Sequence, residues 1–350
     1  MTPSAQELAQ SNDLMHEALW TDGLPVIPPH RDLVDEFVLA SGRAGDEMVG
    51  EVPPLGGHAS IERIAANSVM AGCRPEYMPV VVTALEAMLE KSFNLNGMQC
   101  STHMATPLVI VHGPIRKQLG INCGNNVFGQ GNRANATIGR AVKLALVNLG
   151  GARPGEADKS TLGHPGKYTY CIGENEEESP WEGLHVDRGL KAEDSAVTVF
   201  GCESPHNLNN QMVDDPFTLL TCLATVMATL GSNNPYVMGD SFVIFGPEHA
   251  AVLGRAGWKR RDVRQFLFEN ARLPHHMVKL GGVYGRETEK YNIWPRWIDR
   301  SREDAMIPVC RAPDQIGVMV AGGPGKHSAY LPGWGSRSVT RKIEIPGGNQ

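Results

Sequence analysis

The sequence predicts an α/β protein made of two related halves, with parallel or mixed sheets covered by helices. Short apolar runs rich in β-branched residues, typical of buried strands, alternate with longer stretches at helical spacing. Glycine (39 residues) and proline (24 residues) are abundant, which indicates many turns. A similar order of elements occurs twice along the chain, and this predicts an internal duplication.

Residues 1–78 are expected to form an N-terminal segment of helices and extended chain. Apolar residues at helical spacing predict helices within residues 1–20, over 31–41 and from Ser60. Prolines and glycines between residues 51 and 57 predict a linker.

The first α/β half is expected to span residues 79–210. A predicted helix over 79–91 precedes the apolar run 108–111, which is typical of a buried strand and stops at a Gly-Pro pair. Further strands are predicted at 167–172 and 195–200.

The second half, residues 211–350, is predicted to repeat this order. Its strand at 242–245 ends in a Gly-Pro pair, as does the strand at 108–111. We match the apolar run 317–321 with the strand at 195–200. Two copies of this kind predict a cleft between the halves. Helices are predicted at 217–230 and 259–270.

The stretch 122–151 joins a loop rich in glycine and asparagine to a helix that ends at two glycines. Free N–H groups and the helix dipole favour an anion at such a helix start, and two arginines add positive charge. We expect a small anionic substrate here; the alternative is a strained turn before a well-capped core helix. The expected substrate-binding residues are Asn122, Asn125, Arg133, Asn135, Thr137 and Arg140.

Cys100 and His103 lie just before the first predicted buried strand. A neighbouring imidazole can lower the pKa of a thiol and activate it as a nucleophile. Together with Cys123, the two residues could also bind zinc, although their spacing matches no common zinc motif. The alternative is a loop cysteine beside a solvated histidine.

Three further turns carry polar residues that are suited to chemistry. His164 and Lys167 are expected to bind a carboxylate or phosphate. Glu174 follows a predicted strand and is a candidate general base, because sites gather at strand ends in α/β sheets. Cys202 and His206 form a candidate nucleophile or acid–base pair after the next strand. The alternatives are ordinary polar turns and a solvated acidic run.

Composition and motifs argue against several classes of protein. The net charge of −6 gives no basic surface for nucleic acid, and no apolar window reaches the length of about 20 residues that spans a bilayer. No secretory signal is predicted, and seven cysteines without a C-x-x-C pair indicate reduced thiols in the cytoplasm. No conventional NAD or ATP motif is present. A flavin or a divalent metal stays open.

Six segments point to a family: WTDGLPVIPP, AGCRPEYMPVVV, PLVIVHGPI, GQGNRANATIGRA, HPGKYTYCIGENEEESPW and FGPEHAAVLGRAGW. Together they resemble a poorly characterised bacterial family whose members are often encoded beside, or fused to, a small domain with a UGSC or CGSC motif, which can contain selenocysteine. No CGSC occurs in this sequence. By association the resemblance implies redox or thiol chemistry, with a small CGSC- or UGSC-type redox protein as a separate partner.

These observations predict a cytosolic, homo-oligomeric enzyme that acts on a small polar or anionic organic substrate. Thiol-assisted lyase or oxidoreductase chemistry in a cleft between the halves is the favoured class. One alternative is a metal-dependent hydrolase or lyase with Cys and His ligands. Another is a non-catalytic subunit that positions a CGSC-type thiol protein. The expected proton carriers and thiols are His103, Glu174, His206, Cys100, Cys123, Cys171 and Cys202.

Overall fold

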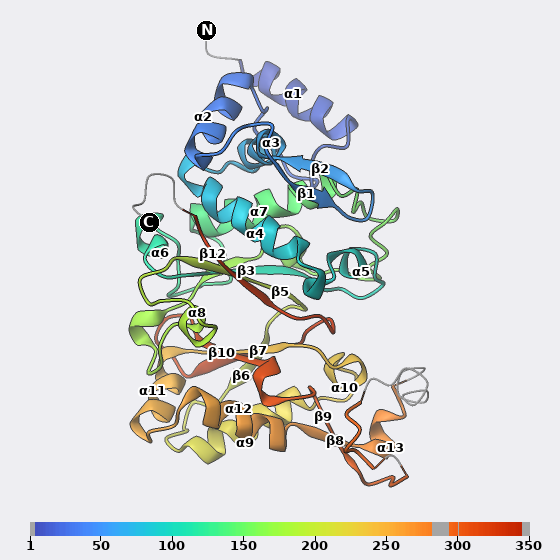
Figure 1. The fold of residues 1–350 in the computed structure, drawn as a ribbon, viewed down its shortest axis with the longest axis vertical. Coiled ribbons are helices and arrows are strands. Elements are labelled where there is room, and N and C mark those ends of the chain that lie inside the picture. Colours follow the sequence, from blue (N-terminus) through green and yellow to red (C-terminus); the bar gives the residue numbers. More distant parts are fainter. Residues whose placement is uncertain (1–3, 282–293, 300, 345–350) are drawn as a thin grey trace.

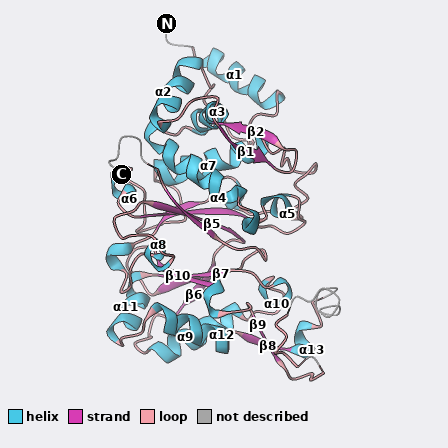
Figure 2. Ribbon diagram, viewed as in Figure 1, coloured by secondary structure: helices cyan, strands magenta, loops and turns pink. Residues whose placement is uncertain are grey.

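Two mixed β-sheets stacked face to face form the centre of the protein, and helices cover their outer faces (Figures 1 and 2). The computed structural model describes residues 4–281, 294–299 and 301–344. The layers follow one another as helices, sheet, sheet and helices, with the N-terminal helices beyond the first layer. The predicted α/β fold with mixed sheets covered by helices is confirmed.

The first sheet contains four strands from both ends of the chain. In spatial order they are β12 (Val339–Lys342), β5 (Ala196–Cys202), β3 (Thr106–His112) and β4 (Cys171–Gly173). β4 runs parallel to β3, whereas β5 is antiparallel to both β3 and β12. Every residue of β3 and β5 is buried. The strand predicted at 167–172 begins later, because Pro165–Lys167 (η3) form a 3-10 turn.

The second sheet also contains four strands, and it confirms the strands predicted at 242–245 and 317–321. In spatial order they are β10 (Ile316–Val320), β7 (Ser241–Phe245), β11 (His327–Leu331) and β6 (His206–Asn209). β10 runs parallel to β7, and β11 is antiparallel to both β7 and β6.

The two sheets exchange strands. β6 follows β5 in sequence but pairs in the second sheet, and β12 follows β11 but pairs in the first. The orders β4-β3-β5-β12 and β10-β7-β11-β6 therefore have the same strand directions. β10 takes the place of β4, so the match of 317–321 with 195–200 is wrong; β11 is the counterpart of β5. The common topology agrees with an internal duplication, which stays a prediction.

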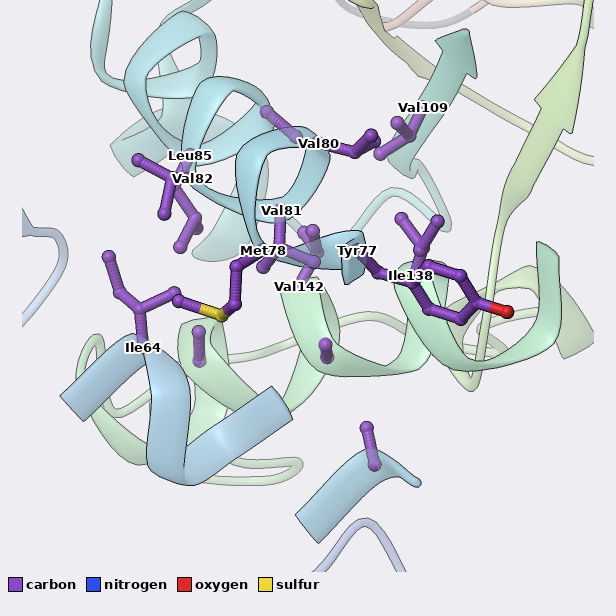
Figure 3. Close-up of a cluster of buried hydrophobic side chains, with 14 of the residues drawn as sticks. Ile64, Tyr77, Met78, Val80, Val81, Val82, Leu85, Val109, Ile138 and Val142 are labelled. Carbon is purple, nitrogen blue, oxygen red and sulfur yellow. The ribbon is translucent and has the colours of Figure 1, made fainter. Parts of the chain in front are cut away.

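Helices α4 (Met78–Leu89) and α7 (Arg133–Asn148) cover the outer face of the first sheet. α4 begins with a proline in its first turn and buries all three of its valines. Figure 3 shows Met78 between Ile64 and the α7 residue Val142. Val109 and Val111 of β3 belong to the same cluster of buried side chains, so the sheet and the helices share one core.

Helices α9 (Pro216–Met227), α11 (Pro247–Arg255) and α12 (Arg260–Asn270) cover the outer face of the second sheet. The helices predicted at 217–230 and 259–270 are thus confirmed within a few residues. Asp215 caps α9 by accepting the Thr218 N–H at 2.9 Å.

The N-terminal segment packs on the helical layer rather than on a sheet (Figure 1). It comprises α1 (Ala5–Glu17), α2 (Arg31–Ser41), β1 (Met48–Val52), β2 (Gly57–Ser60) and α3 (Ile61–Ala71). β1 and β2 pair in an antiparallel hairpin, so the stretch expected as a linker at 51–57 is largely a strand and its turn. α3 is mostly buried and packs against α7.

A second core lies between the sheets. Leu108 and Ile110 of β3 and Phe200 of β5 belong to one apolar cluster with Phe242 and Ile244 of β7. The rings of Phe200 and Phe242 stack with centroids 4.4 Å apart. Residues that alternate along each strand therefore serve two cores, one under the helices and one between the sheets.

No helix in the described ranges is both long and apolar enough to span a membrane.

Short helices, turns and strands make up the remaining elements of the described chain. The short elements are η1 (Pro75–Tyr77), η2 (Lys91–Phe93), α5 (Leu95–Gln99), α6 (Ile115–Gln118), η4 (Glu176–Glu178), α8 (Leu184–Asp187), α10 (Asn234–Val237), β8 (Arg272–Pro274), α13 (His275–Val278), β9 (Met306–Pro308) and η5 (Pro313–Gln315).

Candidate functional site

The asparagines at the start of α7 hold the glycine-rich loop in place. Asn132 caps the helix by accepting the Asn135 N–H at 3.0 Å. The Asn135 side chain accepts the N–H of Asn122 and donates to its carbonyl, at 2.8 and 2.9 Å. The Asn125 amide packs against Gly323 in the turn after β10, where a Cβ would clash with it. The side chains of Asn125, Asn132 and Asn135 therefore contact other parts of the protein, which is what holds the loop in place.

The two arginines expected to hold an anion are also engaged by the protein. Arg133 donates to the carbonyls of Gly72 and Cys73 at 3.0–3.2 Å. Arg140 makes two hydrogen bonds of 2.8 Å with the Asp22 carboxylate and two more with backbone carbonyls. The Thr137 hydroxyl donates back into the helix. The geometry therefore disagrees with an anion site at this helix start and agrees with the capped core helix.

The cysteines do not form the expected reactive pairs. Burial raises the pKa of the Cys171 and Cys202 thiols, so both stay protonated at neutral pH. Burial also raises the pKa of Cys123, although the nearby Arg116 opposes this effect. Cys100 is exposed, and its sulfur lies 3.9 Å from the Asn96 side chain. No such hydrogen bond joins Cys100 to His103, or Cys202 to His206, in the described ranges.

His103 pairs instead with Glu203, which was not among the residues selected from the sequence. The ring Nε2 lies 2.9 Å from a Glu203 carboxylate oxygen, and Nδ1 accepts the Ala105 N–H at 3.1 Å. Nε2–H is therefore the donor to the carboxylate. His206 lies exposed on β6. The expected zinc ligands Cys100, His103 and Cys123 do not gather in the described part of the chain.

His164 and Lys167 line a pocket of about 740 Å³. Its walls come from the turn at residues 21–23, the middle of α7 and the loop 154–168. Lys167 forms an ion pair with Asp158, with 2.6 Å between nitrogen and oxygen. Burial lowers the pKa of His164, so its ring is neutral at physiological pH. The pocket lies in the first half; a hollow of about 290 Å³ lies between the 127–128 loop and the glycine turn 322–325 of the second half.

Lys143 projects from α7 into this pocket, and sequence reasoning missed it. Burial, reinforced by the positive charge of Lys167, lowers the pKa of its amine from 10.5 to about 8. No hydrogen bond or ion pair engages the amine among the described residues. Both sequence neighbours, Val142 and Leu144, are buried. A lysine inside the apolar run 142–147 was the signal that could have revealed it.

The charges around the pocket leave Lys143 without its own counter-ion. Asp22 pairs with Arg140, and Asp158 pairs with Lys167. Each wall carboxylate is thus neutralised by a cation other than Lys143. When protonated, the amine gives the pocket one uncompensated positive charge, which favours a small anion.

A second group of titratable side chains lies at the carboxyl ends of β3 and β4. His112, Glu174, Glu176 and His185 bring one possible ligand atom each to within 4.8 Å of one another. Burial disfavours the charged form of Glu174, but hydrogen bonding to His112 lowers its pKa overall. Glu174 is fully buried, and its carboxylate is held by the His112 ring and by the Leu184 N–H, at 2.6 and 2.9 Å. Its role as a general base stays a prediction.

The comparisons with known proteins add no family. No family model matches the sequence, and no curated protein matches it. The resemblance to the family with CGSC-type partners stays a prediction.

Proposed function

We propose that the protein is a lyase whose Lys143 amine forms an imine with the carbonyl carbon of a small oxo acid. The proposal is carried by one observation: the amine of Lys143 opens on a 740 Å³ pocket, has no partner among the described residues and has a pKa lowered to about 8. An amine desolvated beside another cation is the usual form of an imine-forming lysine. This keeps the expected lyase class and anionic substrate, with an amine in place of a thiol.

The charge balance supports a carboxylate substrate. The uncompensated positive charge of the Lys143 amine attracts the anion into the pocket. As Lys143 loses its proton, the free amine attacks the substrate carbonyl. The new N–C bond forms, and the carbonyl oxygen leaves as water.

The protonated imine then acts as an electron sink. Cleavage of a bond between the carbon next to the imine and either a carboxylate, as in a 3-oxo acid, or a hydroxyl-bearing carbon, as in a 4-hydroxy-2-oxo acid, sends its electron pair into the imine and gives an enamine. The departing fragment leaves as CO2 or, after its hydroxyl proton passes to solvent, as an aldehyde. Protonation of the enamine and hydrolysis of the imine release the product and restore the amine. About one-tenth of an amine with a pKa of 8 is unprotonated at pH 7, which a lysine of ordinary pKa does not approach.

Imine formation is tested by reductive trapping. The protein is incubated with a panel of 2-oxo and 3-oxo acids and sodium borohydride, and the modified peptide is found by mass spectrometry. We expect one adduct, on Lys143, that Lys143→Arg abolishes and that the exposed-lysine control Lys91→Arg retains. Adducts spread over surface lysines at equal rates, or none with any oxo acid, would refute the proposal.

The expected oxidoreductase and subunit roles make different predictions. A non-catalytic subunit would show no trapping by itself and turnover only after a CGSC-type thiol protein is added. The homo-oligomeric state and the cytoplasmic location stay predictions. Light scattering of the purified protein tests the first of these.

A further inference from the structure

His185 is a buried histidine whose ring nitrogens make no hydrogen bond among the described residues, although Nδ1 lies 3.9 Å from a Glu176 carboxylate oxygen. The residue is 1 % exposed, and neither ring nitrogen has a hydrogen-bond partner in the part of the chain that the structure describes. The ring stacks on His112, with centroids 5.7 Å apart and 28° between the planes. A buried polar group left unsatisfied costs about 1–3 kcal/mol. Because neither ring nitrogen of His185 makes a hydrogen bond among the described residues, the ring is suited to bind a ligand.

The side chains around His185 are those that bind transition metals. His112 ends β3, Glu174 follows β4 directly, Glu176 begins the next turn, and His185 lies in α8. Their four candidate atoms lie within 4.8 Å of one another. Two imidazole nitrogens and two carboxylate oxygens are a donor set suited to zinc and its neighbours among divalent metals.

The atoms behind these four side chains orient them. His112 Nε2 lies 2.8 Å from the Thr198 hydroxyl. Its Nδ1 lies 2.6 Å from a Glu174 carboxylate oxygen, and a metal ion bound by both atoms would replace this hydrogen bond. The backbone N–H of Leu184 donates to the Glu174 carboxylate at 2.9 Å, and the N–H of Gly113 donates to Glu176 at 2.7 Å. Ligand histidines and carboxylates are commonly held by such outer hydrogen bonds.

The surrounding charges also permit a cation. Glu176 and Glu177 both pair with Arg116, at 3.0 and 3.1 Å. Arg260 lies 3.9 Å from Glu174. Lys117 also pairs with Glu177, at 2.8 Å. The three carboxylates are therefore balanced by three cations, so a divalent ion does not enter a net positive environment.

We propose that His112, Glu174, Glu176 and His185 bind one divalent transition-metal ion, with zinc preferred. His112, Glu174 and His185 are almost fully buried, and none of the four residues lines a described pocket. Because three of its four residues are almost fully buried, the site is structural, and it ties β3, β4 and α8 together. It shares no residue with the Lys143 pocket, so each proposal can fail without the other.

Metal analysis and titration test this site. Protein purified without chelators is analysed for metals, then stripped with EDTA and titrated with ZnCl2 by calorimetry. We expect one equivalent of bound metal, a lower melting temperature after stripping and its recovery on adding Zn²⁺. His185→Ala should weaken Zn²⁺ binding at least tenfold. The control His249→Gln should not, because His249 is buried but bonded to Ser328 and Asn210.

A spectroscopic experiment covers the case in which His185→Ala does not fold. Stripped wild-type protein is loaded with Co²⁺, which has intense visible absorption when its coordination is tetrahedral. Thr198→Val should change this spectrum, because His112 would lose the hydrogen bond that orients its ring. Absence of metal from the purified protein, together with no Zn²⁺ binding by the stripped wild type, would overturn the proposal. Unchanged Zn²⁺ affinity in a folded His185→Ala protein would do the same.

Discussion

Replacing Lys143 by Met should stabilise the protein at neutral pH while removing the proposed reactive amine. Met has a similar length and no charge, so it keeps the apolar stem packed between its neighbours on α7. The variant thus separates the energetic cost of the buried ammonium group from the packing of the side chain.

The magnitude follows from the pKa of Lys143, which falls from 10.5 to about 8. Each pKa unit corresponds to about 1.4 kcal/mol, so the protonated amine costs the folded protein about 3 kcal/mol at pH 7. Between pH 8 and 10.5 the unfolded chain binds more protons at this position than the folded chain, and wild-type stability therefore rises with pH. The cost should shrink to about 1 kcal/mol at pH 10.

Urea unfolding followed by circular dichroism measures this effect at pH 7 and pH 10. We expect Lys143→Met to be more stable than wild type by about 3 kcal/mol at pH 7 and by about 1 kcal/mol at pH 10. The control Lys91→Met, at an exposed lysine, should change the free energy of unfolding by less than about 0.5 kcal/mol. If Lys143→Met and wild type have the same free energy of unfolding at pH 7, or if their difference does not change with pH, the lowered pKa of Lys143 is refuted.

Three further variants test the fold at three different positions, each by urea unfolding. Phe200→Ala should lose about 3–5 kcal/mol, because a large ring leaves the core between the sheets; a loss below about 1 kcal/mol would mean that this core is not closely packed. Gly113→Ala should lose about 2–4 kcal/mol, since φ is +77° and the new Cβ would lie 2.1 Å from the Asp194 carbonyl oxygen; an unchanged midpoint would contradict that turn. Asp22→Asn should lose about 3 kcal/mol, as Arg140 would keep a buried charge without its counter-ion, and a neutral outcome would place the pair in solvent.

Local pattern in the sequence predicted most helices and strands correctly. The apolar runs at 108–111 and 242–245 lie in buried strands, and the caps around 122–135 do begin a helix. Such features depend on side chains within a few residues of one another, so they can be predicted from the sequence alone. The prediction of a linker at 51–57 was wrong, because this stretch pairs in a β-hairpin despite its high proline and glycine content.

The candidate sites depended on contacts between distant residues. Arg140 had the charge of an anion-binding group, but its partner Asp22 lies far away in sequence and occupies it. Lys143 appeared as a polar position on a core helix, and only the loop carrying Asp158 and Lys167 turns its surroundings into a pocket. Glu174 was selected, whereas His112 and His185, which lie beside it, were not.

The sequence by itself determined the fold class, the positions of most elements and the abundance of polar turns, because periodicity and turn chemistry act locally. Only the tertiary structure decided which charges are neutralised and which strand joins which sheet. It also decided which amine lines a pocket without a hydrogen-bond or ion-pair partner among the described residues. Those outcomes depend on burial and on distances between residues far apart in the chain. Free energies of charged groups change steeply with both, so the same lysine or arginine can be a surface residue, half of an ion pair or a reactive group.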